Sequence, residues 1–161
     1  MDGIALLARQ LVSNDNLKVD DREVVLNICE LLRLKEESGL INTYLCQQVE
    51  AEAASTYLVC RYELQVTRYR HVIDEYRAGK YVELGDRNDE GLKWSKQGRE
   101  QWLLAMDLEY PTKLEQLQNM ESLLSALKGL QSIVFGRDRK LEQLSVNYRR
   151  ELRSDKPSAG W

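Results

Sequence analysis

The last third of the chain carries the feature that constrains its fold most. Between Met120 and Tyr148, apolar side chains recur in alternating steps of three and four residues, and Arg137 is the one polar member of the series. This spacing places side chains along one face of an α-helix, where they need a partner surface to be buried. We predict a helix from Pro111 to about Arg153. Its predicted oligomerisation surface consists of Met120, Leu123, Leu127, Leu130, Val134, Leu141, Leu144 and Tyr148.

Further apolar residues widen this stripe beyond a two-stranded seam, namely Leu114, Leu117, Leu124 and Ile133. A helix with so wide an apolar face can contact more than one partner helix. The pattern leaves two arrangements open, a hairpin within one chain and a bundle between chains.

A second long stretch, from Leu40 to Lys80, also repeats apolar residues at helical spacing and contains no Pro. Its first Gly is Gly79, a residue type that often ends a helix, so we expect the helix to stop there. Upstream, Glu36 to Gly39 form either a kink or a continuous part of the helix.

The other segments follow from turn residues and caps. We predict an all-α fold of long helices in a hairpin or coiled-coil-like arrangement, which assembles into a homo-oligomer. The expected parts are a short helix and turn (1–16), a helical arm with a basic end (17–80), an acidic Gly-rich loop (81–94), a helix capped by Ser95 followed by the long C-terminal helix (95–153), and a tail (154–161).

Composition and motifs argue against several classes of protein function. The net charge of -3 means that any nucleic-acid site is a local patch. No apolar run approaches the roughly 18 residues of a membrane span. Three cysteines lack the spacing of a metal or disulfide framework, which fits a reducing cytoplasm and leaves a metal or redox role as a minor alternative. His71, the single histidine, has no predictable catalytic partner, so we expect neither an enzyme nor a cofactor.

The basic end of the Leu40 to Lys80 stretch is the first candidate site. Arginines alternate with tyrosines there, a combination that single-strand binders use for phosphates and stacked bases. The candidate DNA-binding residues are Arg61, Tyr62, Arg68, Arg70, Arg77 and Lys80. We expect Tyr62 to be exposed and Tyr69 and Tyr76 to lie in the core. A second basic cluster, of unassigned role, spans residues 137–153. For both clusters the alternative to a binding role is that the basic residues only stabilise the C-terminus of their helix.

The order of these elements resembles the UvsY recombination mediators of T-even-like phages. The resemblance covers roughly Leu40 to Leu144 and rests on RYELQVTRYR, on DEYRAGK, on the acidic Gly-containing loop, and on AMDLEYPTKLEQLQNMESLLSALKGLQSIVFGRDRKLEQL. It implies a non-enzymatic, ring-like homo-oligomer that binds single-stranded DNA and helps a recombinase replace the single-strand-binding protein, in the host cell cytoplasm. It also implies that the DNA-binding segment is the stretch containing Arg61, Arg68 and Arg70.

One rival from another class fits the same pattern. In that reading the chain is a coiled-coil interaction protein, such as a phage inhibitor or assembly factor, and it does not bind DNA. Its basic residues would then cap helices or pair with neighbouring acids.

Overall fold

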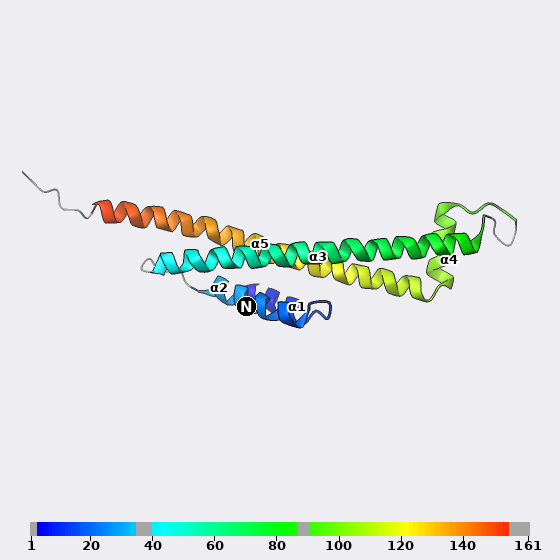
Figure 1. Cartoon of the computed structure of the whole chain (residues 1–161), viewed down its shortest axis with the longest axis horizontal. Helices are drawn as coiled ribbons and strands as arrows, with labels where there is room; N and C mark the ends of the chain where they lie inside the picture. The colour runs from blue at the N-terminus through cyan, green and yellow to red at the C-terminus, as the bar shows by residue number, and fades with distance from the viewer. Residues whose placement is uncertain (1–2, 35–39, 87–90, 155–161) are drawn as a thin grey trace, which may run out of the picture. The chain divides into compact units, whose positions relative to one another are not determined.

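The computed structural model describes residues 3–34, 40–86 and 91–154, with side chains up to residue 150 (Figure 1). Within these ranges the chain forms five α-helices and no strand, which confirms the all-α class. The helices are α1 (Gly3–Val12), α2 (Val19–Arg33), α3 (Ile41–Leu84), α4 (Lys96–Met106) and α5 (Glu109–Ser154).

Two helix ends differ from the sequence-based expectation. The helix α3 does not end at Gly79 but continues to Leu84, and the glycine with a left-handed backbone is Gly85, at φ 70°. A left-handed glycine directly after the last turn is the usual way for a helix to stop. The helix α5 begins at Glu109, so Pro111 lies in its first turn, where a missing N–H removes no helical hydrogen bond. The possible kink at residues 36–39 lies outside the described residues.

The chain divides into two compact units. Unit 1 comprises residues 1–60 and 125–161, and unit 2 comprises residues 61–124. Both α3 and α5 contribute residues to each unit, and we describe each unit by itself.

In unit 1, α1 packs against α2. The first half of α3 lies antiparallel to the second half of α5 (Figure 1). Two hydrogen bonds give the register of this antiparallel pair. Gln48 Nε2 donates to the Val134 carbonyl oxygen at 2.7 Å, and Gln131 Nε2 donates to Thr56 Oγ1 at 3.1 Å. Because Gln48 is 1% exposed, its hydrogen bond to the backbone satisfies a buried amide donor.

The Arg137 side chain, the polar member of the apolar series, is 5% exposed in unit 1. Its Nη1 donates a hydrogen bond to the carbonyl oxygen of Leu31, and its guanidinium lies 5.7 Å from the centre of the Tyr44 ring. Leu31 is near the end of α2, where its carbonyl oxygen also accepts the N–H of Leu34 at 3.2 Å and lies at the negative end of the helix dipole. Arg137 therefore joins α2 to α5 and is structural.

In unit 2, the end of α3, the short helix α4 and the start of α5 surround a small core of Ile73, Leu103 and Tyr110. Ser95 caps α4 as predicted, since its Oγ accepts the N–H of Gly98 at 2.9 Å. Trp102 and several tyrosines pack against this core. The helix α4 therefore closes the end of the hairpin in unit 2.

The predicted oligomerisation stripe is largely covered within the chain itself. Five of its members have exposed fractions of 0–1%, namely Leu123, Leu127, Leu130, Val134 and Leu141. Other residues of the same chain therefore bury these five side chains, and they are not available as a surface for a second copy. Met120 is half-buried, while Leu144 and Tyr148 are 38% and 37% exposed. Figure 1 shows why: the last turns of α5 extend past the first turn of α3.

Candidate nucleic-acid interface

Arg68 and Arg70 are the two exposed arginines among the predicted DNA-binding residues of α3. Arg68 makes no ion pair with any described residue. Arg70 pairs with Glu121 of α5, with its Nη2 2.5 Å and its Nε 3.0 Å from Glu121 Oε1. The two side chains are 58% and 40% exposed, and such surface pairs contribute less than about 1 kcal/mol. A phosphate could therefore replace Glu121 at little cost. Arg61 is half-buried.

Arg77 and Lys80, by contrast, belong to a network of tyrosines and carboxylates in unit 2. Arg77 Nε donates to Tyr110 Oη at 2.8 Å and lies 3.4 Å from Glu100, while its Nη1 bonds Asp74 at 3.1 Å. Three partners hold this guanidinium, which is 32% exposed. Its geometry is that of a residue that joins α3 to α4 and α5.

Lys80 is held in the same way. Its Nζ lies 3.0 Å from Glu83 and 3.6 Å from Asp107, and it sits 5.6 Å from the centre of the Tyr76 ring. The hydrogen bond to Glu83, the largest effect, outweighs desolvation and raises the pKa of Lys80. Carboxylates therefore surround Arg77 and Lys80, which makes both less accessible to phosphates than Arg68, and their role in DNA binding stays a prediction.

Glu100 of α4 is the acceptor at the centre of this network. Tyr81 Oη donates to Glu100 Oε2 at 2.7 Å, and Tyr110 Oη donates to Oε1. Burial raises the pKa of Glu100, but these two hydrogen bonds and the charge of Arg77 outweigh it, so the pKa lies below its ordinary value. Burial, together with the bond to Glu100, raises the pKa of Tyr81 to about 12.

Asp107 is the second carboxylate of the network. Its Oδ1 accepts the N–H groups of Glu109 and Tyr110, both at 2.9 Å, and Tyr76 Oη donates to it at 2.9 Å. Asp107 thus ends α4, caps α5 and is tied to α3. This role of Asp107 was not predicted from the sequence. The signal was present, since an Asp shortly before a Pro in a first helical turn is typical of a helix start.

One of the three tyrosines discussed above is placed differently from the prediction. Tyr62 is 1% exposed, so the expectation that its ring stands free for a base is wrong. The reason is its helical position, four residues from both Leu58 and Val66, which are buried at 0% and 3% exposure. Tyr69 and Tyr76 are half-buried and pack against the core of unit 2, close to what we expected.

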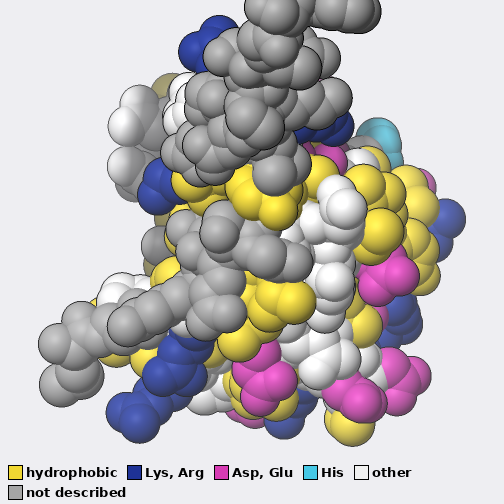
Figure 2. All heavy atoms as spheres, turned by 90° about the vertical axis from the view of Figure 1, so that its left-hand side faces the viewer, with side chains coloured by type: hydrophobic (Ala, Val, Ile, Leu, Met, Phe, Trp, Pro, Cys, Tyr) yellow, Lys and Arg dark blue, Asp and Glu magenta, His cyan; other side chains and the backbone are white. Residues whose placement is uncertain are grey.

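The second basic cluster is more accessible than the first. Four of its members are exposed and form no ion pair in the described part of the chain, namely Arg139, Lys140, Arg149 and Arg150. Arg137 is buried, and the side chain of Arg153 lies outside those described. Among the described side chains that Figure 2 shows, basic, acidic and apolar groups are intermixed.

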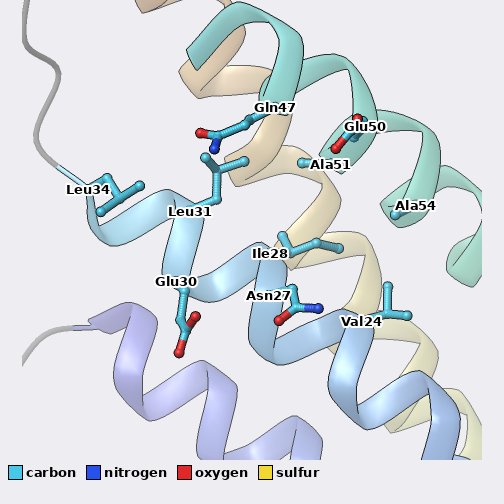
Figure 3. A pocket seen from close by; sticks show the side chains of 10 residues that line it. All are labelled: Val24, Asn27, Ile28, Glu30, Leu31, Leu34, Gln47, Glu50, Ala51 and Ala54. Atoms are coloured by element: carbon cyan, nitrogen blue, oxygen red, sulfur yellow. The ribbon is translucent and has the colours of Figure 1, made fainter. Parts of the chain in front are cut away.

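One hollow of about 450 Å³ lies between α2 and α3 in unit 1 (Figure 3). Most of its wall is apolar, from Val24, Ile28 and Leu31 of α2 and Ala51 and Ala54 of α3. Two carboxylates, Glu30 and Glu50, belong to its lining but come from different helices, and Figure 3 shows Glu30 pointing away from α3. The arrangement lacks a paired acid and base for catalysis.

The remaining chemistry of the described residues is limited. Within those residues, no three His, Cys, Asp or Glu side chains gather as metal ligands, and no helix has the length and apolar character to cross a membrane. Cys29, Cys46 and Cys60 are all free cysteines. Cys29 is buried, which raises its pKa, whereas Cys46 and Cys60 are exposed. Comparison with protein-family models, with curated proteins and with solved structures found no match to this chain.

Proposed function

We propose that this protein is a non-enzymatic, UvsY-like recombination mediator that binds single-stranded DNA and helps load a recombinase onto strands coated with single-strand-binding protein. The observation that carries the proposal is the exposure of Arg68 and Arg70 on α3. Arg68 has no carboxylate partner among the described residues, and Arg70 has one weak surface partner, Glu121. Both guanidinium groups are thus accessible to phosphate oxygens.

Homo-oligomerisation is part of the proposal. Leu144 and Tyr148 continue the buried series of α5 at the same spacing, yet both are more than one third exposed. A second copy that covered Leu144 and Tyr148 would extend the buried apolar series of α5. Several copies in one assembly would present several weak DNA contacts at once and so bind more tightly. The protein would act in the host cell cytoplasm.

The test is a fluorescence anisotropy titration with a labelled 30-nucleotide single strand. Arg68→Ala with Arg70→Ala should weaken binding markedly, because two phosphate contacts are lost. The pair Arg68→Lys and Arg70→Lys keeps both charges and should retain most of the affinity. If the double Ala variant bound as tightly as the unchanged protein, α3 would not be the DNA-binding site.

The rival function, a helical interaction protein that does not bind DNA, also has an observation in its favour. Arg70, Arg77 and Lys80 all pair with carboxylates, as expected of residues that stabilise a hairpin. The same titration separates the two functions. No binding by the unchanged protein at 50 mM salt would support the rival.

A further inference from the structure

We propose that the last turns of α5 carry a second contact site for single-stranded nucleic acid. The α5 basic surface consists of Arg139, Lys140, Arg149 and Arg150 with the apolar side chains of Phe135 and Val146. The inference rests on the proposed function and adds a contact region to it.

No ion pair among the described residues compensates the charge of this surface. Residues 139–150 contain these four basic residues and the acid Glu142, and with the flanking Asp138 and Glu151 the segment still has more basic than acidic residues, whereas the whole chain has a net charge of -3. All four basic side chains are exposed, and none forms an ion pair within the described residues. The paired Arg77 and Lys80 of α3 differ in this respect.

Helix stabilisation does not explain this charge. A basic residue interacts favourably with the helix dipole only within about the last turn. Arg139 and Lys140 precede the end of α5 at Ser154 by about four turns. Only Arg149 and Arg150 are close enough to that end to benefit.

The aromatic component points to unpaired bases. Phe135, Arg139, Val146 and Arg150 follow one another in steps of four, seven and four, so they share one side of α5. Phe135 is 42% exposed and Val146 is 45% exposed on this side. It lies away from the side of α5 that carries the buried residues Val134 and Leu141. An exposed ring one turn from an exposed guanidinium lets a base stack while a phosphate is bound, the arrangement that single-strand binders use.

An anionic membrane fits the same surface less well. A helix that binds a membrane surface presents a wide apolar face beside its basic residues. The wide apolar face of α5 is covered, since Leu127, Val134 and Leu141 are 0–1% exposed. Phe135 and Val146 alone offer little apolar area for insertion.

The test uses the full chain and the labelled 30-nucleotide single strand at several salt concentrations. Arg139→Ala with Arg150→Ala should reduce the slope of log K against log salt by about 1.4, since each lost phosphate contact removes about 0.7. Phe135→Ala should lower affinity about fivefold or more and leave the slope unchanged, because stacking releases no counterions.

A matched control changes the net charge equally at other exposed positions. Arg9→Ala with Lys93→Ala removes two exposed basic residues outside both proposed sites and should leave the affinity and the slope unchanged. Circular dichroism and urea midpoints check that each variant folds. The substituted α5 side chains are exposed, so they should fold like the unchanged protein.

The outcomes separate this inference from the proposed function. If the unchanged protein binds and Arg139→Ala with Arg150→Ala changes nothing, the α5 site is overturned while the proposed function stands. If only the α5 variants lose binding, the α5 site is supported and the α3 site is wrong. Equal binding of duplex DNA with no effect of Phe135→Ala would overturn single-strand recognition, and absence of all binding would overturn both proposals.

Discussion

Replacement of Asp107 by Ala should destabilise unit 2 by about 3 kcal/mol, the sum of a lost helix cap worth about 1 kcal/mol and a lost hydrogen bond to a charged acceptor worth about 2 kcal/mol. The carboxylate accepts two backbone N–H groups at the start of α5 and the hydroxyl of Tyr76, and its side chain is 9% exposed. Alanine leaves all three donors without this acceptor. Asp107→Asn keeps an oxygen for the cap and should cost about half as much.

Urea unfolding followed by tryptophan fluorescence is the appropriate assay, because Trp102 packs against the core of unit 2. Trp161→Phe in every variant removes the signal of the C-terminal tryptophan. Burial raises the pKa of Asp107, but its hydrogen bonds and Lys80 outweigh this, so the pKa lies below its usual 3.8. The stabilisation is therefore present above pH 4 and is lost as the pH falls through the lowered pKa, a loss absent from Asp107→Asn. An unchanged midpoint for Asp107→Ala would refute the role of Asp107 as a cap.

Three further predictions concern the apolar series of α5, the contact of Arg137 with α2, and the tyrosine network of unit 2. Leu127→Ala should lower the free energy of unfolding by about 3 kcal/mol in urea titrations. Leu144→Ala should lower it by less than about 1 kcal/mol and reduce the oligomer seen by light scattering. Arg137→Ala should cost about 2 kcal/mol and increase hydrogen exchange at the end of α2, whereas unchanged exchange would contradict its bond to Leu31. Tyr81 should ionise near pH 12 in absorbance titrations at 295 nm. The stabilisation that Tyr81 provides therefore persists below pH 10 and is lost as the pH rises toward 12.

Local signals in the sequence predicted the helices well. The alternating steps between Met120 and Tyr148 require a helix with one apolar face, and Ser95 has the side chain that caps a first turn. Gly79 misled the prediction of the end of α3. A glycine inside a helix costs only about 1 kcal/mol, and the packing of Tyr76 and Tyr81 on either side of it offsets that cost.

The candidate site was predicted less well, because its properties depend on contacts between distant segments. Glu121 lies 51 residues from Arg70, and Asp107 lies 31 residues from Tyr76, so no local pattern indicates these pairs. The burial of Tyr62 could have been predicted from the sequence. Its spacing from Leu58 and Val66 places it on the buried face of α3. The position of a residue on its helix decides its burial more than the charge of the residue beside it in the sequence, here Arg61.

The salt dependence of single-strand binding tests the central claim most directly. Arg68 and Arg70 of α3 with Arg139 and Arg150 of α5 supply about four phosphate contacts, which gives a slope near -2.8 in log K against log salt. The dissociation constant should therefore rise about 50-fold between 50 and 200 mM salt. Tight binding that does not change with salt, or no binding at 50 mM, would contradict a single-strand mediator that works through these four arginines.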